Sequence, residues 1–253
     1  MTDLHNNLHN KMICTIPARG GSKRLTRKNM RELAGKPLIA YSIEAALESG
    51  LFEQVYVCTE DEAIARTATQ FGAIVPQLVP EDLCGDLVAS HIPCQYIASQ
   101  LRSQGQIDSL LCLQPSSPLR SAQDVRDAVE KFSQGHCDFL VSVTAIDPHD
   151  FHWAVVPGDG PYWKMFFGTQ YHKERPLLPP VYRPNGSIKV AKLSALAAIG
   201  HFFGERLDVI ETPLERSVHV AVEFDLRLCE TILQGQGMVS STSKPVSAVS
   251  GSL

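Results

Sequence analysis

The chain reads Met12-Ile13-Cys14-Thr15-Ile16-Pro17-Ala18 near its start, an apolar run typical of a buried strand. It continues at once into Arg19-Gly20-Gly21-Ser22-Lys23-Arg24-Leu25-Thr26-Arg27-Lys28-Asn29-Met30-Arg31. This second stretch holds six of the chain's 23 Lys and Arg residues and no acid, although the formal net charge is −4. Such a concentration of positive charge on one loop predicts a bound anion that carries several negative charges.

Two adjacent glycines make the same loop suited to phosphate. Gly20 and Gly21 have no Cβ, so the backbone can approach a ligand closely. Successive N–H groups on such a turn form a concave anion site, and cationic side chains add charge-assisted hydrogen bonds. The alternative is an ordinary solvated basic loop. The position after a first strand, the twin glycines and the lack of acids favour phosphate.

Apolar runs alternate with helical patterns up to about residue 146, which predicts an α/β fold with a mainly parallel sheet covered on both faces. Ligands of such sheets bind beyond the carboxyl ends of the strands, where the basic loop lies. The predicted strands are Met12–Ala18, Gln54–Thr59, Ala73–Leu78, Asp108–Gln114, Asp138–Ile146, Ser187–Ala191, Leu207–Glu211 and Ser217–Val222. The predicted helices are Pro37–Ser49, Asp61–Phe71, Asp86–Gln104, Ala122–Gln134 and Leu226–Leu233.

Composition narrows the class of protein. With 253 residues, 44% of them hydrophobic, the chain can bury the core of one large domain. A sequence pI near 6.1 argues against a nucleic-acid partner. The seven cysteines include no C-x-x-C pair, which argues against disulfides and zinc. No run reaches membrane-spanning length and no leader is visible, so we expect a cytoplasmic protein without a membrane partner.

Three regions depart from the alternation of predicted strands and helices. Residues 1–10 are polar and expected to be loose, and the Ser-rich tail over 236–253 is expected to be disordered. Between them lies a domain over 11–235, interrupted at 147–184 by an aromatic and proline-rich segment without clear period. Such an insertion is typical of a lid or a subunit interface, with an excursion of the core as the alternative.

Four blocks of sequence, in order, resemble the acylneuraminate cytidylyltransferases, and the resemblance runs from about Ile13 to Leu233. The first is Ile16-Pro17-Ala18-Arg19-Gly20-Gly21-Ser22-Lys23, continuing to Lys28-Asn29, and the second is Gly35-Lys36-Pro37-Leu38-Ile39-Ala40-Tyr41-Ser42-Ile43. The third and fourth are Leu113-Gln114-Pro115-Ser116-Ser117-Pro118-Leu119-Arg120 and Tyr182-Arg183-Pro184-Asn185-Gly186-Ser187-Ile188. The resemblance implies a three-layer, Rossmann-like nucleotidyltransferase fold.

The resemblance also implies a reaction, in which the anomeric hydroxyl of an acid sugar attacks the α-phosphorus of CTP and pyrophosphate leaves. By resemblance, Arg19 and Lys28 hold the triphosphate and have catalytic roles. Gly20, Gly21 and Ser22 donate hydrogen bonds to it. Asn29 contacts the nucleotide, and Ser90 falls where the family recognises cytosine.

On the sugar side, Gln114 matches a glutamine that hydrogen-bonds the acid sugar. Arg175 matches an arginine that family members direct at the active site, often from the partner subunit. Phe202 and Phe203 match an aromatic pair around the N-acyl methyl group, although ordinary core packing is an equal alternative. Lys189 replaces a tyrosine common in the family and would place an ammonium near the sugar. Arg120 could contact the site or anchor its own turn.

The metal site is where the chain departs most from the family. The usual D-x-D pair that binds Mg²⁺ is replaced by His219 and Ala221, and neither suits a hard cation. Glu223 and Asp225 also lie two residues apart and could reach the metal if the strand slips by two. Alternatively, they cap the last helix. Val79 also stands where many relatives have an arginine.

The sequence therefore predicts a Mg²⁺-dependent cytidylyltransferase that acts on CTP and a nonulosonic acid, and that forms a homodimer. One alternative is a catalytically silent protein that keeps the nucleotide or sugar pocket, an idea that Val79, His219 and Ala221 favour. Another is an enzyme for 3-deoxy-manno-octulosonic acid, which the Arg-Pro-Asn-Gly block and Phe202-Phe203 disfavour.

Overall fold

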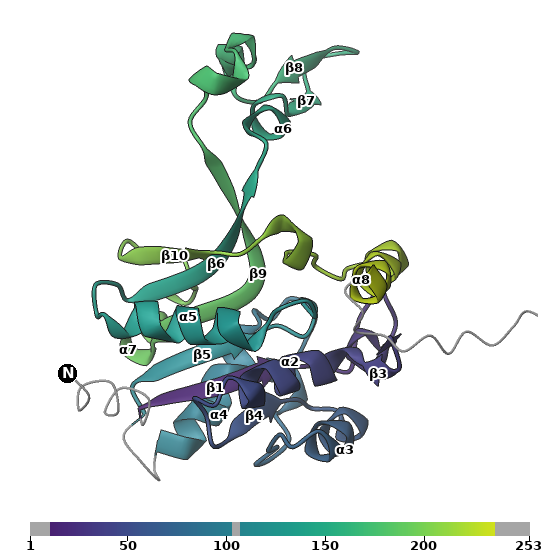
Figure 1. Ribbon diagram of the computed structural model, residues 1–253, viewed down its shortest axis with the longest axis vertical. Helices are drawn as coiled ribbons and strands as arrows, with labels where there is room; N and C mark the ends of the chain where they lie inside the picture. Colours follow the sequence, from purple (N-terminus) through teal and green to yellow (C-terminus); the bar gives the residue numbers. More distant parts are fainter. Residues whose placement is uncertain (1–10, 103–106, 236–253) are drawn as a thin grey trace, which may run out of the picture.

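A single mixed sheet of six strands forms the centre of the computed structural model, which describes residues 11–102 and 107–235 (Figure 1). The strand order is β10-β6-β9-β5-β1-β4. The strands are β1 (Met12–Pro17), β4 (Val55–Cys58), β5 (Ser109–Leu113), β6 (Phe139–Ile146), β9 (Val181–Lys192) and β10 (Leu207–Glu211). Residues 1–10 and 236–253, for which a loose start and a disordered tail are predicted, lie outside the described residues.

Five of the six strands run in the same direction, as the predicted mainly parallel sheet requires. β1 pairs in parallel with β4 and β5, and β10 pairs in parallel with β6. β9 is the exception, because it is antiparallel to both β5 and β6. Its chain enters the sheet from the carboxyl edge, so residues near its start lie at the same edge as the ends of β1 and β5.

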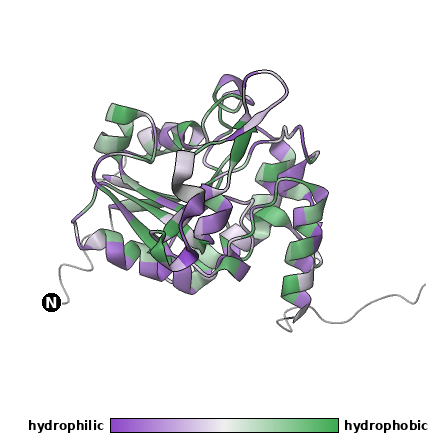
Figure 2. Cartoon of the chain, turned by 90° about the horizontal axis from the view of Figure 1, so that it is seen from above, coloured by the Kyte–Doolittle hydropathy of each residue, from purple (hydrophilic) through white to green (hydrophobic). Residues whose placement is uncertain are grey.

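Helices cover both faces of this sheet and complete three layers. The helices are α2 (Leu38–Glu48), α3 (Glu62–Gln70), α4 (His91–Arg102), α5 (Ala122–Ser133), α6 (Pro148–His152), α7 (Leu193–Ile199) and α8 (Glu223–Gly235). Cys14 and Ile16 of β1 pack with apolar residues of α2 and α5 on one face. Ile13 packs with residues of α4 and α7 on the other. Figure 2 shows hydrophobic strands at the centre and helices that alternate hydrophobic with hydrophilic residues.

A third, smaller core lies under α8. Leu226, Cys229 and Leu233 of this helix pack on Leu33 and Leu38, around the short hairpin of β2 (Glu32–Leu33) and β3 (Lys36–Pro37). This contact joins the end of the described chain to the segment that follows the basic loop. No described helix is long and apolar enough to cross a membrane.

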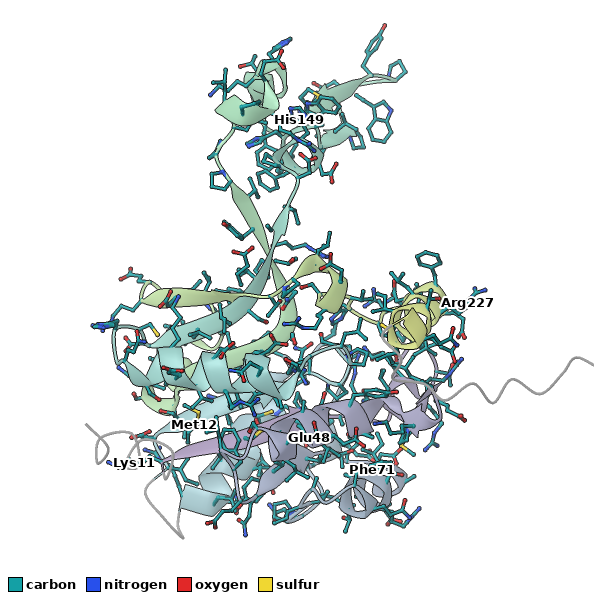
Figure 3. All side chains as sticks on the ribbon, in the orientation of Figure 1. Lys11, Met12, Glu48, Phe71, His149 and Arg227 are labelled. Atoms are coloured by element: carbon teal, nitrogen blue, oxygen red, sulfur yellow. The ribbon has the colours of Figure 1, made fainter. Side chains whose placement is uncertain are left out.

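The insertion predicted at 147–184 forms an arm that stands away from the sheet (Figure 1). It contains α6, a hairpin of β7 (Val155–Pro157) and β8 (Trp163–Met165), and the 3-10 turns Gly168–His172 and Arg175–Leu177. The end of β6 and the start of β9 form its stem, where Ile146 pairs with Val181. His149 stacks on Trp153 inside the arm, with ring centroids 4.6 Å apart (Figure 3).

Two predicted strands are wrong. The run Ala73–Leu78 contributes one bridge, Ile74 to Tyr56, because Pro76 has no N–H with which to extend the ladder. Over Ser217–Val222, the backbone bonds go elsewhere: Val220 N–H donates to the Ser116 carbonyl, and Ala221 N–H donates to a side chain. This segment is a loop.

Two helix starts also differ from the sequence prediction. α4 begins at His91 rather than Asp86, because residues 85–90 form turns beside the basic loop. α8 begins at Glu223 rather than Leu226.

Candidate active site

A cavity of about 210 Å³ lies at the carboxyl edge of β1 and β5, where the sequence predicts ligand binding. The structure brings to this cavity seven of the residues chosen from sequence, namely Arg19, Gly21, Ser22, Lys28, Asn29, Ser90 and Gln114. They come from the loop after β1, the start of α4 and the end of β5. Asn29 is buried, and its amide donates to the Arg19 carbonyl at 2.9 Å, which fixes the shape of the loop.

Gly20 serves the fold of this loop rather than lining the cavity. Its N–H donates to Glu60 Oε1 at 2.7 Å, just after β4. A Cβ at this position would lie 2.5 Å from Asp61 Oδ2, so only glycine allows the loop to approach this closely. Gly21, by contrast, has open space around its Cβ position and lines the cavity. Gly20 is therefore needed for the close packing of the loop, whereas Gly21 faces the cavity.

The carboxylate of Asp86 forms ion pairs with two cationic side chains of the basic loop. Asp86 Oδ1 lies 2.9 Å from Arg19 Nη1, and Asp86 Oδ2 lies 2.8 Å from Lys23 Nζ. Arg19 Nη1 also donates to the Gly85 carbonyl at 3.1 Å. The hydrogen bond from Lys23 is the main influence that lowers the pKa of Asp86, so this carboxyl is ionised.

Ser90 and Gln114 join two walls of the cavity. Gln114 Nε2 donates to Ser90 Oγ at 3.2 Å, linking the residue that follows β5 to the residue that precedes α4. Burial lowers the pKa of Lys28, with Arg24 and Arg19 adding to the effect, because like charges disfavour another ammonium. An anion placed among these cations would be stabilised by all of them.

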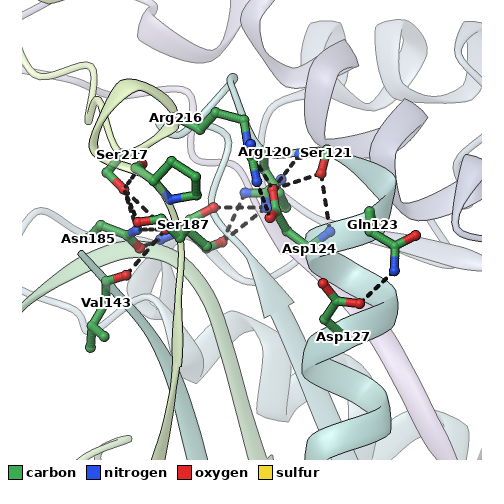
Figure 4. A network of polar contacts seen from close by, with 12 residues as sticks. Arg120, Ser121, Gln123, Asp124, Asp127, Val143, Asn185, Ser187, Arg216 and Ser217 are labelled. Carbon is green, nitrogen blue, oxygen red and sulfur yellow. Dashed lines mark hydrogen bonds and ion pairs between the residues drawn. The ribbon is translucent and has the colours of Figure 1, made fainter. Parts of the chain in front are cut away.

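Arg120 is a buried cation whose described hydrogen bonds all go to uncharged acceptors (Figure 4). Its Nη2 donates to the Gln114 and Ser187 carbonyls at 2.9 Å each, and its Nη1 donates to Ser42 Oγ at 3.0 Å. Burial lowers its pKa to about 10. Arg120 therefore anchors the backbone behind Gln114 and ties β5 to β9 and α2.

His219, which the sequence resemblance predicts in place of a metal-binding aspartate, lies next to Gly186, close to the Gln114 side chain. Its Nδ1 is 3.3 Å from Ser116 Oγ, and the ring packs beside Gly186, whose φ of +73° favours glycine. Burial, then Lys28, Arg24 and Lys189, lower the pKa of His219 to about 4. The imidazole is therefore neutral near pH 7.

The residues predicted for the sugar side separate into three environments. Lys189 Nζ lies 5.5 Å from the centroid of the Phe202 ring, and Phe202 is buried against His91. Phe203 is 47% exposed. Arg175 lies on the arm, where its guanidinium is paired with Asp147. One chain therefore does not bring Arg175 to the cavity.

The residues near the cavity do not fit a carboxylate-held Mg²⁺. Asp225 Oδ2 accepts the N–H groups of Ala221 and Val222 at 2.8 and 2.9 Å, which caps α8. Both oxygens of Glu223 accept from Arg31 Nη2 at 2.8 Å. Neither residue lines the cavity. Within the described ranges, no group of three His, Cys, Asp or Glu residues could hold a metal ion.

Sequence reasoning missed the role of Asp86 and left open the role of Arg120, whose contacts favour the anchoring alternative. The run Gly85-Asp86-Leu87 offered a signal for Asp86, since an exposed acid shortly before Ser90 is complementary to the basic loop. No sequence pattern distinguishes a buried arginine from an exposed one, and Arg120 was left with two alternatives. All seven cysteines are free and buried, as expected of small apolar residues.

A glycine-bearing basic loop after the first strand, with its cavity at the carboxyl edge of a three-layer α/β sheet, is the architecture of the Rossmann-like nucleotidyltransferase fold. The structure of CMP:2-keto-3-deoxy-manno-octonic acid synthetase complexed with CTP has this fold, with a TM-score of 0.68 at 16% identity over 89% of this chain and 99% of that one. A family profile described as Cytidylyltransferase matches residues 13–148. The chain belongs to this cytidylyltransferase family.

Curated relatives of the chain are cytidylyltransferases for nonulosonic acids. The CMP-N,N'-diacetyllegionaminic acid synthase of Legionella pneumophila is 33% identical over 88% of this chain and 97% of its own length. The N-acylneuraminate cytidylyltransferase of Escherichia coli is 34% identical over 90% of this chain and 53% of its own length. The pseudaminic acid cytidylyltransferase of Campylobacter jejuni is 42% identical over 54% of this chain. The matched part spans 60% of the length of that relative.

Proposed function

We propose that this protein transfers CMP from CTP to the anomeric hydroxyl of an N-acylneuraminate-type nonulosonic acid and releases pyrophosphate. The observation that carries the proposal is the convergence of Arg19, Ser22, Lys28, Ser90 and Gln114 on one cavity. The relatives that share most of this chain's length are named for CMP-legionaminic and CMP-acylneuraminic acid synthesis, which supports the same substrate class.

In the proposed reaction, the sugar oxygen forms a bond to the α-phosphorus while the bond to the bridging α,β-oxygen breaks. The hydroxyl proton leaves to solvent, and pyrophosphate departs in line. Arg19 and Lys28 would hold the triphosphate, and the N–H of Gly21 and the hydroxyl of Ser22 would donate to it. Fixed cations stabilise the charge that develops on the phosphate oxygens, and positioning supplies the rest.

The acid sugar would lie beyond Gln114, towards Lys189. The Gln114 amide would hydrogen-bond the sugar, and the Lys189 ammonium would attract its carboxylate. Phe202, buried beside Lys189, would border the N-acyl group. Ser90, bonded to Gln114, would read cytosine on the nucleotide side.

Mg²⁺ would accompany CTP as the counter-ion of its phosphates, because such ions often need few protein ligands. Since CTP is the donor, we propose that the reaction takes place in the cytoplasm.

A homodimer built through the arm is part of the proposal. Tyr162, Trp163 and Phe166 are 76%, 67% and 60% exposed, a density of aromatic surface typical of interfaces. Arg175, also on the arm, would then serve the partner's cavity. A Trp163→Ser variant should sediment as a monomer, whereas Phe224→Ser, which removes an equally exposed ring from α8, should not.

The test of the activity is pyrophosphate release from CTP and Mg²⁺ with a panel of legionaminic, pseudaminic, sialic and 3-deoxy-manno-octulosonic acids. Release with a nonulosonic acid supports the proposal, and release only with the octulosonic acid would replace its substrate. The likeness to the synthetase for the latter sugar is one of fold alone, at 16% identity.

A catalytically silent nucleotide- or sugar-binding protein is the second candidate. The partners of Glu223 and Asp225 favour it, because both carboxylates are engaged away from the cavity. CTP binding without pyrophosphate release across the panel, with Mn²⁺ also tried, would establish this alternative.

A further inference from the structure

Positive side chains gather at the place where His219 replaces a family aspartate. Lys28 lines the cavity, and Lys28, Arg24 and Lys189 all lie near enough to act on the charge of His219. Ser116, the hydrogen-bond neighbour of the ring, offers only a hydroxyl. A divalent ion here would meet three cations, and each repulsion would be twice that of a single charge.

Most of the nearby carboxylate oxygens are committed to other partners. Asp86 is shared by Arg19 and Lys23, and Asp225 Oδ2 caps α8. Glu223 is paired with Arg31, and Glu60 Oε1 accepts the N–H of Gly20, whereas the buried Glu60 Oε2 has no hydrogen-bond partner among the described residues. Glu60 Oε2 is therefore a single unpaired carboxylate oxygen. The groups beside His219, the Ser116 hydroxyl and the Gln114 amide, are neutral, and hard cations prefer carboxylate oxygen.

We infer that the described residues of this chain form no divalent-metal site beside the nucleotide cavity, and that Lys28, Arg24 and Lys189 offset phosphate charge that a metal would otherwise offset. The inference rests on the proposed function, because it takes a nucleoside triphosphate as the ligand. Protein cations are fixed before the ligand arrives, so they need no reorganisation during the reaction. Nucleotide binding then depends on the protein's own charges more than on an added ion.

The first test measures Mn²⁺ binding to the full chain without nucleotide, by electron paramagnetic resonance. We expect the wild-type protein to bind no Mn²⁺ at the cavity. Replacing His219→Asp together with Ala221→Asp should create a site and give one bound ion. Stoichiometric binding to the wild type that is lost in Asp225→Asn, Glu223→Gln, Glu60→Gln or Asp86→Asn would overturn the inference. Binding that survives all four substitutions combined in one chain, and that CTP does not displace, lies outside the cavity and leaves the inference standing.

The second test compares CTP affinity in EDTA and in Mg²⁺ by calorimetry. We expect dissociation constants within about threefold of each other, less than one charged hydrogen bond contributes. Lys28→Met should weaken CTP binding in EDTA by about tenfold or more. The control is Lys36→Met, whose ammonium is paired with Glu44 on the far side of α2. Binding that appears only with Mg²⁺ would overturn the inference. No binding in either buffer would instead remove the proposed function.

Lys189 gives a third, independent readout. Lys189→Met should increase the dependence of CTP binding on Mg²⁺, because one of the cations that substitutes for the metal is gone. An unchanged ratio of the two dissociation constants in this variant, with an unchanged affinity in EDTA, would show that Lys189 does not take part.

Discussion

The Asp86 carboxylate lies 2.9 Å from the Arg19 guanidinium, so in this structure an acid of the chain takes the place that the proposed function gives to phosphate. The same carboxylate holds Lys23 with its second oxygen. The cluster of Arg19, Lys23 and Asp86 has two positive charges and one negative charge. Its net charge is therefore positive, and it can still attract a triphosphate. A triphosphate that contacts both cations therefore competes with Asp86.

Asp86→Asn should therefore bind CTP more tightly, by about two- to fivefold, the range that an exposed ion pair accounts for. Calorimetry of CTP binding measures the effect. Asp82→Asn is the matched control, because Asp82 is an exposed acid in the same loop with no described ion pair to the basic loop. Weaker binding in Asp86→Asn would mean that the acid positions Arg19 rather than competing with the ligand.

Gln114→Glu should raise the KM for the acid sugar by about tenfold or more, since it sets a carboxylate against the sugar's own. The KM for CTP should change less, because the ligand's phosphates are held on the other wall. Initial rates with each substrate varied in turn separate the two effects. Gln123→Glu, an exposed glutamine on α5, serves as the control. A sugar KM equal to that of the wild type would exclude Gln114 as the sugar contact.

Arg120→Met should lower the free energy of unfolding by about 2–4 kcal/mol, because it removes several hydrogen bonds that a buried charged group donates to carbonyl and hydroxyl acceptors. Those acceptors are the Gln114 and Ser187 carbonyls and the Ser42 hydroxyl. Urea denaturation gives the measurement. The comparison is Arg66→Ala, an exposed arginine paired only with Glu62 in the same helix, which should change stability by less than about 0.5 kcal/mol. Equal losses in both variants would contradict an anchoring role for Arg120.

Acid should destabilise the protein through His219. Its pKa is about 4 in the folded chain against 6.5 for a free imidazole, so between these values the unfolded chain binds a proton that the folded one does not. The free energy of unfolding should then fall as pH decreases from 6.5 to 4, by about 3 kcal/mol at most from this group. His219→Asn should flatten that part of the profile, and His136→Gln, an exposed histidine, should not. A wild-type slope in His219→Asn would show that another group is responsible.

Local patterns were sufficient for the parts of the fold in which a strand has a continuous apolar run or a helix has one apolar stripe. β1 and the basic loop follow from an apolar run and a change in charge, and the parallel order of β1 with β4 and β5 follows from alternation with helices. The antiparallel direction of β9 could not be predicted, because it depends on how the arm returns to the sheet. The same holds for residues 217–222, whose apolar alternation is typical of a strand although their hydrogen bonds go to loops.

In the candidate site, too, some features could be predicted from local sequence and others could not. Arg19, Ser22 and Lys28 are close in sequence, and a single loop carries them to the cavity. The ion pair of Glu223 with Arg31 joins residues 192 positions apart, so no local sequence pattern predicts it. The helix-cap reading of Asp225 was one of the two alternatives from sequence, and the backbone contacts of its carboxylate favour it.

Arg120 has one more consequence, for the behaviour of the site at high ionic strength. Mobile ions screen exposed charges such as Lys23 within about 10 Å in 0.1 M salt, but they do not reach a guanidinium enclosed by β5, β9 and α2. The potential that Arg120 adds behind Gln114 therefore persists in concentrated salt, where that of the basic loop fades. Ligands held near Gln114 should lose less affinity with added salt than ligands that contact only the loop.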